Sequence, residues 1–246
     1  MTFLNTGIRT NGSFNAAFWF VIPLTVLGLI CAMVYPAYAK SAPMKKVAVK
    51  ACASALFVAG ALIFTVAAGG GFFAGMMLAA LICGAFGDVF LSFRGFKKEL
   101  LFISFLTGGL FFFAGHILYL VLFFSLAPLN LWLLFLPAAF IVLPIIFAKP
   151  IGNAFGTTKV VPLACLYAAA VGLVVMATLN LLIAEPSLKT GLLFTAGVLF
   201  AASDTVLTLN NALKDEKRKL QTSYIVAALY YSAQWIFVYT VFLTLL

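Results

Sequence analysis

The chain has 246 residues, of which 65% are hydrophobic and 9% are charged, and its formal net charge is +9. Water-soluble domains carry about 25% charged residues, so composition excludes a soluble fold, and the mean hydropathy of +1.19 indicates a lipid environment. The positive charge does not indicate nucleic-acid binding, because the basic residues lie in short loops between apolar runs, where they orient a membrane protein and contact anionic headgroups.

Apolar runs long enough to cross a bilayer, which takes about 20 residues, follow one another along the whole chain. We therefore predict one all-α domain, residues 1–246, built as a polytopic bundle of eight transmembrane helices. Gly69-Gly70-Gly71 separates the second run from the third, and Pro128 and Asn130 separate the fourth from the fifth. The expected spans are 17–39, 47–68, 72–93, 100–125, 129–148, 160–184, 190–211 and 221–246.

The first run ends in Ala37-Tyr38-Ala39, which is similar to a signal-peptide cleavage site. The run is longer than the apolar region of a signal peptide, and its positive flank follows it instead of preceding it. We therefore expect a first membrane span whose N-terminus lies outside.

Loop charges predict the orientation of the bundle. The odd-numbered loops hold 13 of the 15 basic residues, and Arg9 and Lys189 are the two on the other side. Because positive loops stay in the cytoplasm, we expect the odd loops to be cytoplasmic and both termini to be non-cytoplasmic.

Cysteine and histidine patterns do not indicate a metal or redox site. The four cysteines lie inside apolar runs without CxxC spacing, and His116 is the one histidine. We read the cysteines as small core residues, and we expect neither a metal nor an organic cofactor.

Asp88 and Asp204 are the two acids well inside expected spans; the other four lie in loops or at helix ends. Inserting an Asp near a helix centre costs roughly 2.5–3.5 kcal/mol, which calls for a polar cavity. Asp88 lies six residues before Arg94 and Asp204 ten before Lys214, which places both on the order of 9–15 Å from the cytoplasmic loops. Two carboxyls in a low-dielectric site favour one protonated and one ionised group, as acid–base hydrolysis needs. The plainer alternative is that each Asp only hydrogen-bonds a neighbouring helix.

Further polar side chains lie inside or at the ends of the expected spans. They form candidate pocket residues: Lys50, His116, Tyr119, Tyr230, Tyr231 and Gln234. Each also has an ordinary structural explanation, since Tyr belongs to interfacial belts, Lys extends its amine toward water, Gln bridges helices and His can be a satisfied core group.

The two Asp segments also suggest an internal repeat. Gly87-Asp88-Val89 and Ser203-Asp204-Thr205 each precede a basic loop, and a helix with His116 or Gln234 follows 28 or 30 residues after the Asp. We hypothesise a parallel 4+4 repeat about an axis along the membrane normal, with the two acids facing across it.

Four motifs in chain order resemble the lysoplasmalogenase family, the YhhN-like multi-pass membrane proteins. They are Gly84-Ala85-Phe86-Gly87-Asp88-Val89-Phe90-Leu91, Gly115-His116-Ile117-Leu118-Tyr119, Leu199-Phe200-Ala201-Ala202-Ser203-Asp204 and Tyr230-Tyr231-Ser232-Ala233-Gln234. Lys50 matches a family lysine, but the proline that often follows that lysine is missing here. The resemblance covers the second to the eighth expected helix.

The resemblance implies hydrolysis of the vinyl-ether bond of lysoplasmalogens to a fatty aldehyde and glycerophospho-ethanolamine or -choline. Asp88 and Asp204 would be the general acid and the base, in an order that the sequence leaves open. The implied partner is a lysophospholipid that enters from the bilayer. Lys50 or Arg94 would hold its phosphate, and Tyr230, Tyr231 or Trp235 would face its ammonium. His116 and Gln234 would orient the acids or the glycerol hydroxyl.

Two other classes of function stay open at this point. Membrane-embedded acids and an internal repeat are also typical of a proton-coupled transporter, and a non-catalytic scaffold could use the acids to join helices. The expected location is the cell (inner) membrane of a bacterium or the endoplasmic-reticulum membrane of a eukaryote. Oligomeric state, headgroup preference and chain-length preference do not follow from the sequence.

Overall fold

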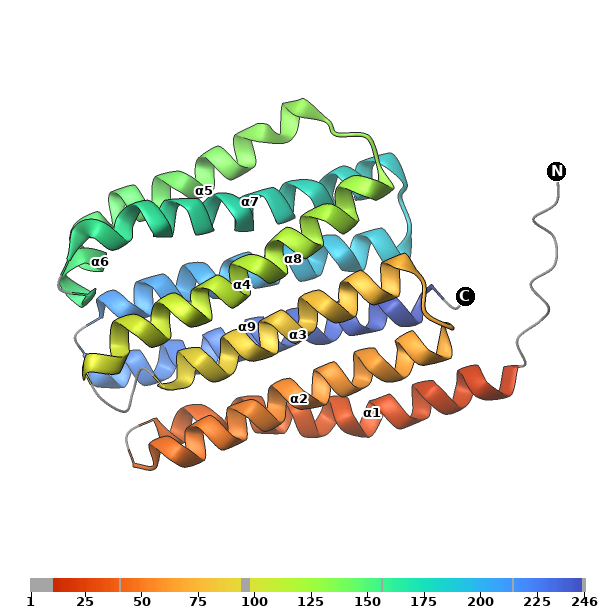
Figure 1. Ribbon diagram of the computed structural model, residues 1–246, viewed down its shortest axis with the longest axis horizontal. Coiled ribbons are helices and arrows are strands. Elements are labelled where there is room, and N and C mark those ends of the chain that lie inside the picture. The colour runs from red at the N-terminus through yellow and green to blue at the C-terminus, as the bar shows by residue number, and fades with distance from the viewer. Residues whose placement is uncertain (1–10, 40, 94–97, 156, 214, 245–246) are drawn as a thin grey trace.

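A computed structural model describes residues 11–39, 41–93, 98–155, 157–213 and 215–244, and the part of the chain it describes is helical without strands (Figure 1). The long helices are α1 (Asn11–Val34), α2 (Pro43–Ala67), α3 (Phe72–Ser92), α4 (Lys98–Leu126), α7 (Val161–Ala184), α8 (Leu188–Ala212) and α9 (Glu216–Phe242). The short ones are η1 (Tyr35–Tyr38), η3 (Leu131–Leu134), α5 (Phe135–Ile146), α6 (Ala148–Phe155) and η4 (Thr158–Val160).

Seven helices in the described ranges are long and apolar enough to cross a membrane, so the chain is a multi-pass membrane protein. The fifth expected span, 129–148, is not one long helix, and this part of the prediction is corrected. Its 12-residue α5 rises only about 18 Å against about 30 Å of hydrocarbon. Pro144 lies inside α5, and α6 follows after a break at Phe147. Proline cannot donate a backbone hydrogen bond to the helix, which accounts for the irregularity of this segment.

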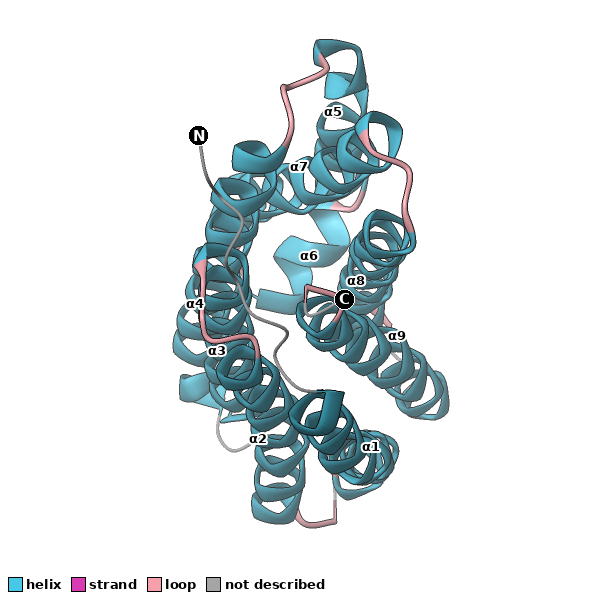
Figure 2. Ribbon diagram, turned by 90° about the vertical axis from the view of Figure 1, so that its right-hand side faces the viewer, coloured by secondary structure: helices cyan, strands magenta, loops and turns pink. Residues whose placement is uncertain are grey.

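The helices pack as neighbours around a closed arrangement. α1 contacts α2, α2 contacts α3, α3 contacts α4, α4 contacts α7, α7 contacts α8, and α9 joins α8 to α1, α2 and α3. α5 packs on the outside of α7, where Gly172 permits close approach to Pro137. Viewed along the bundle in Figure 2, α6 lies at the far end, between the surrounding helices.

The bundle has two distinct ends. The starts of α2, α4, α7 and α9 share one end, at the left of Figure 1, and α1 begins and α9 finishes at the other. We name the first the basic end, because Lys45, Lys46, Lys159 and Lys217 lie there. Its assignment to the cytoplasm stays a prediction, as do the outward termini and the 4+4 repeat.

The turn between α2 and α3 depends on glycine. Gly69, Gly70 and Gly71 all have positive φ angles, of 71°, 80° and 105°. Side chains with a Cβ rarely adopt this conformation, so the three glycines allow the chain to reverse between two antiparallel spans.

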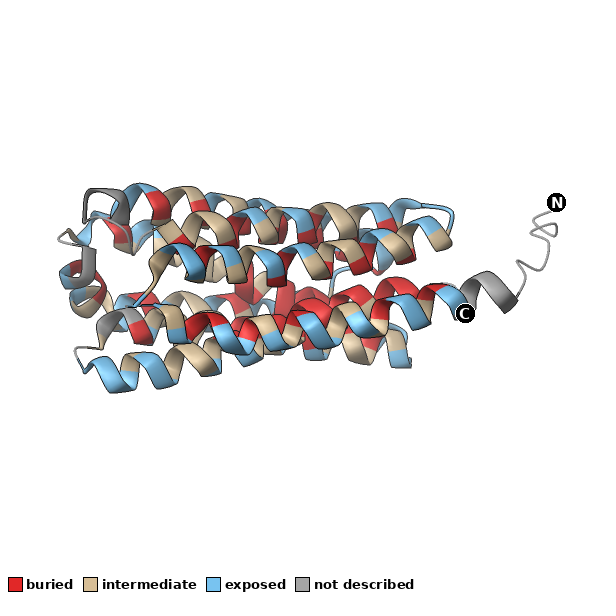
Figure 3. Ribbon diagram, turned by 90° about the horizontal axis from the view of Figure 1, so that it is seen from below, coloured by how far each residue is buried: buried red, intermediate tan, exposed pale blue. Residues whose placement is uncertain are grey.

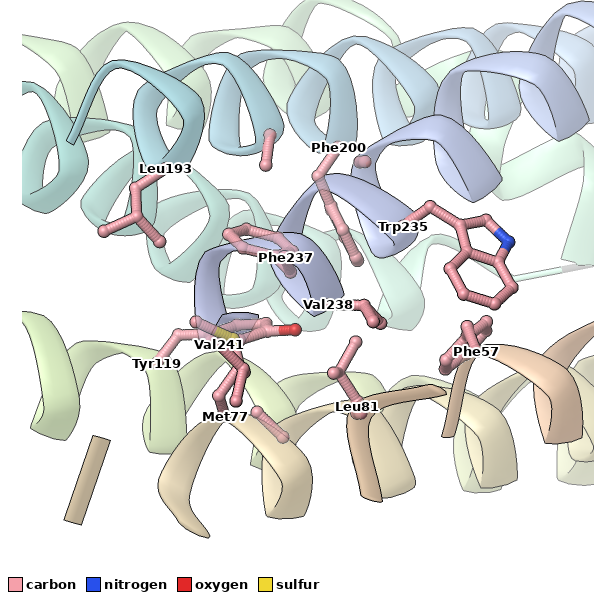
Figure 4. Close-up of a cluster of buried hydrophobic side chains, with 14 of the residues drawn as sticks. Phe57, Met77, Leu81, Tyr119, Leu193, Phe200, Trp235, Phe237, Val238 and Val241 are labelled. Carbon is pink, nitrogen blue, oxygen red and sulfur yellow. The ribbon is translucent and has the colours of Figure 1, made fainter. Parts of the chain in front are cut away.

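α9 is the most buried of the candidate spans and α1 the least. Figure 3 shows buried residues inside the bundle and exposed ones around its outside. In Figure 4, Phe237 and Val238 of α9 lie between Phe200 of α8 and Leu81 of α3, so α9 packs in the interior and orders the helices that surround it.

Candidate active site

Asp88 lies near the basic end of α3, and 1% of its surface is exposed. Lys50 Nζ of α2 lies 2.9 Å from its Oδ1, and Ser54 Oγ donates a hydrogen bond of 2.6 Å to its Oδ2. Both carboxylate oxygens therefore have a partner, one of them a cation. Lys50 and Ser54 lie four residues apart, which places both on the same face of α2.

α9 holds Lys50 and Ser54, the two α2 partners of Asp88, in place. The hydroxyl of Tyr231 lies 3.0 Å from Ser54 Oγ and donates to the backbone carbonyl of Lys50 at 3.3 Å. Lys50 Nζ also lies 5.7 Å from the centre of the Tyr35 ring, a distance at which a cation is attracted to an aromatic face. The Asp88 carboxyl therefore lies in a prepared site, in which the Lys50 ammonium can compensate a negative charge.

Asp204 lies on α8 in a different environment. Tyr167 of α7 donates a hydrogen bond of 2.8 Å to its Oδ2. No lysine or arginine in the described ranges forms an ion pair with Asp204. The ring of His116 meets Tyr167 edge to face with 5.3 Å between centroids, and His116 Nδ1 lies 2.6 Å from the carbonyl oxygen of Phe112. His116 thus packs behind Tyr167 and restricts the position of the phenol.

One cavity of about 370 Å³ brings the two acids together. Asp88, Asp204, Tyr167, Lys50 and Tyr230 all line it, and the lining continues to residues at the basic end. The volume falls within the range of about 300–1,000 Å³ that is typical of small-molecule sites. α3 and α8 do not pack closely on each other, so the carboxyls share a cavity between the helices instead of a direct contact between them.

The candidate residues from the sequence divide into three groups. Lys50 and Tyr230 line the cavity, and the Tyr230 hydroxyl faces Asp88. His116 and Tyr231 lie one layer behind the acids. Neither Tyr119 nor Gln234 lines the cavity.

Tyr119 and Gln234 belong to the packed interior. The ring of Tyr119 stacks on Phe237, with 4.7 Å between centroids. Gln234 is 1% exposed and lies against Gly84 of α3, close to Tyr230. Arg94 lies outside the described residues.

Sequence reasoning missed Ser54 and Tyr167. Ser54 could have been found from its position four residues after Lys50, which puts the two on one helix face. Tyr167 is the one aromatic residue of α7, which is a weaker signal, because a lone tyrosine in an apolar span does not indicate which way it points.

The sequence model of the YhhN family matches residues 45–241. The chain belongs to the YhhN family. The matched region includes both acids and their partners Lys50, Ser54 and Tyr167, and the match confirms the resemblance that the motifs suggested. No curated protein and no solved structure matches this YhhN chain.

Proposed function

We propose that this YhhN protein hydrolyses the vinyl-ether bond of lysoplasmalogens and releases a fatty aldehyde and a glycerophospho-ethanolamine or -choline. The observation that carries the proposal is the pair of carboxyls in one cavity with different partners. Asp88 has a cation at 2.9 Å, and Asp204 has a phenol at 2.8 Å. Two carboxyls in unequal environments are the arrangement that separates a general acid from a base.

Vinyl-ether hydrolysis needs both groups. The acid adds its proton to the β-carbon of the double bond, which leaves an oxocarbenium ion on the carbon next to the ether oxygen. Water adds to that carbon while a carboxylate takes one of its protons. The resulting hemiacetal breaks its bond to the glycerol oxygen, which takes up a proton as the aldehyde forms. Overall, one water is consumed, and no electron acceptor is required.

In this proposal, the partners of each carboxyl indicate which one is the general acid and which one is the base. Lys50 and Ser54 stabilise Asp88 as a carboxylate. In this proposal Asp88 therefore faces the oxocarbenium ion and activates the water that attacks it. In the described part of the chain no cation pairs with Asp204, so in this proposal Asp204 carries the proton at the start of the cycle. The Tyr167 hydrogen bond occupies Oδ2, which leaves Oδ1 as the oxygen that delivers the proton.

The polar headgroup would lie toward the basic end. Lys46, Asn210 and Ser223 line the cavity there, and a lysine can contact a phosphate as a point charge. Of the two residues that the sequence suggested for the phosphate, Lys50 pairs with Asp88, and Arg94 lies outside the described residues.

The test is aldehyde release from a lysoplasmenyl lipid by purified protein in detergent or vesicles. Asp88→Asn and Asp204→Asn should each lower the rate by about 10²- to 10⁴-fold, the usual contribution of a general acid or base. Glu185→Gln is the matched control, since this exposed carboxyl lies between α7 and α8 and its loss should leave the rate unchanged.

Two results would overturn the proposal. One is wild-type protein that releases no aldehyde while proteoliposomes show Asp-dependent solute or proton flux, which would make the protein a transporter. The other is full hydrolysis by both Asn variants, which would place the chemistry elsewhere in the chain.

A further inference from the structure

The cavity that holds the two acids also reaches the outer surface of the bundle. Four leucines that line it are exposed: Leu110 of α4 by 59%, Leu163 and Leu166 of α7 by 46% and 56%, and Leu209 of α8 by 37%. The three most exposed of them lie on α4 and α7, where the cavity reaches the surface. Here the opening is apolar and lies in the side wall, between α4 on one side and α7 with the adjoining α5 on the other.

The opening follows from the way α4 and α7 cross. The two helices meet where His116 packs on Tyr167. From there toward the basic end they diverge, as the yellow-green and teal ribbons show at the left of Figure 1. Gly109 and Phe113 of α4 line the cavity on this diverging stretch, opposite Leu163 and Leu166. We name these four residues, together with Leu110, the α4–α7 opening.

A missing side chain keeps space free on the α4 side of the opening. A Cβ built on Gly109 would meet no atom within 4 Å. A Cβ on the preceding Gly108 would lie 2.7 Å from Leu91 Cγ and 3.0 Å from the carbonyl oxygen of Gly87. Gly108 is therefore required for packing of α4 on α3, whereas packing does not require a glycine at position 109.

We propose that the alkenyl chain of the lysolipid enters laterally from the bilayer through the α4–α7 opening, and that Gly109 provides the space through which it passes. This inference rests on the proposed function. A lysolipid has its phosphate and its vinyl ether close together and its chain at the other end. The headgroup can therefore lie toward Lys46 and the vinyl ether at the acids only if the chain leaves sideways, and the opening gives it an apolar route.

The route also accounts for the closed interior on the far side of the acids. There Phe64, Met77, Phe123 and Phe237 are completely or almost completely buried and fill the space between the helices. A chain could not extend along the bundle axis through this packed core.

The first test places a large side chain at position 109, on the α4 side of the opening. Gly109→Trp should lower kcat/KM for a long-chain lysoplasmenyl lipid by about tenfold or more, because the indole would occupy the space of the chain. A soluble analogue with a very short alkenyl chain should be cleaved at a rate within about twofold of wild type. Gly75→Trp is the matched control, since Gly75 also has no neighbour within 4 Å of its Cβ position and does not line the cavity.

A second measurement does not depend on hydrolysis. A lysophospholipid with a photoactivatable group in its chain should label the peptides that contain Leu110 and Leu163–Leu166 in wild-type protein, and Gly109→Trp should lose that labelling. The route is wrong if wild type hydrolyses the lipid, Gly109→Trp changes kcat/KM equally for long-chain and short-chain lipids, and the photoactivatable lipid labels other peptides. If the labelling occurs but no aldehyde is released, the route stands and the proposed reaction is wrong.

Discussion

Replacing Lys50 with methionine removes the cation from Asp88 and keeps a flexible side chain of similar length. Lys50 Nζ and Asp88 Oδ1 are 2.9 Å apart, and the two side chains are 12% and 2% exposed. With an effective dielectric constant of about 20, the attraction at this distance is about 6 kcal/mol. Desolvation of both groups offsets part of this attraction, and loss of one partner of a buried pair costs about 3–5 kcal/mol.

That cost should be visible in thermal unfolding of the purified protein. For a chain of this size, 1 kcal/mol corresponds to about 2–4 °C, so Lys50→Met should lower Tm by about 6–20 °C. The double variant Lys50→Met/Asp88→Asn has no unpaired charge and should recover most of the loss.

The same variants separate stability from activity. The double variant should be stable and inactive, because it lacks the carboxylate proposed as the base. The reasoning is refuted if the two single substitutions lower stability additively in the double variant, since additive effects show that the two side chains do not interact.

Two further predictions concern the second acid and the helix packing. Tyr167→Phe should lower kcat by about tenfold, because the hydrogen bond from the Tyr167 hydroxyl to Asp204 strengthens as that carboxyl gives up its proton. Tyr119→Phe is the control and should leave kcat unchanged. Equal losses of kcat in both variants would contradict the role assigned to Tyr167. Gly108→Ala should destabilise the protein by about 1–3 kcal/mol, because the added methyl would overlap Leu91. Gly109→Ala should be neutral or stabilising, since helical alanine is favoured over glycine, and denaturation midpoints that show the reverse order would contradict the described α3–α4 packing.

The fifth expected span shows how far composition predicts structure. Its apolar residues correctly indicated a helical segment between α4 and α7, and Figure 1 shows α5 running from the end of α4 toward the start of α7. Composition did not reveal that the segment breaks into η3, α5 and α6. The hydrophobic signal measures how apolar a segment is and does not report where a proline-containing helix ends.

The sequence alone determined that this is a helical membrane protein, and it singled out Asp88 and Asp204 as the acids inside its spans. The physical reason is energetic: lipid requires internally bonded helices, and an acid in a span is too costly to leave without a polar environment. The sequence could not determine how each helix is rotated. A helix in lipid is apolar on its outer and inner faces alike, so periodicity did not show that Tyr167 points at Asp204 while Tyr119 and Gln234 point into the packed core. Only the tertiary structure, through the contacts of α2, α7 and α9 with the two acids, decided which polar side chains meet in the cavity and which acid receives the cation.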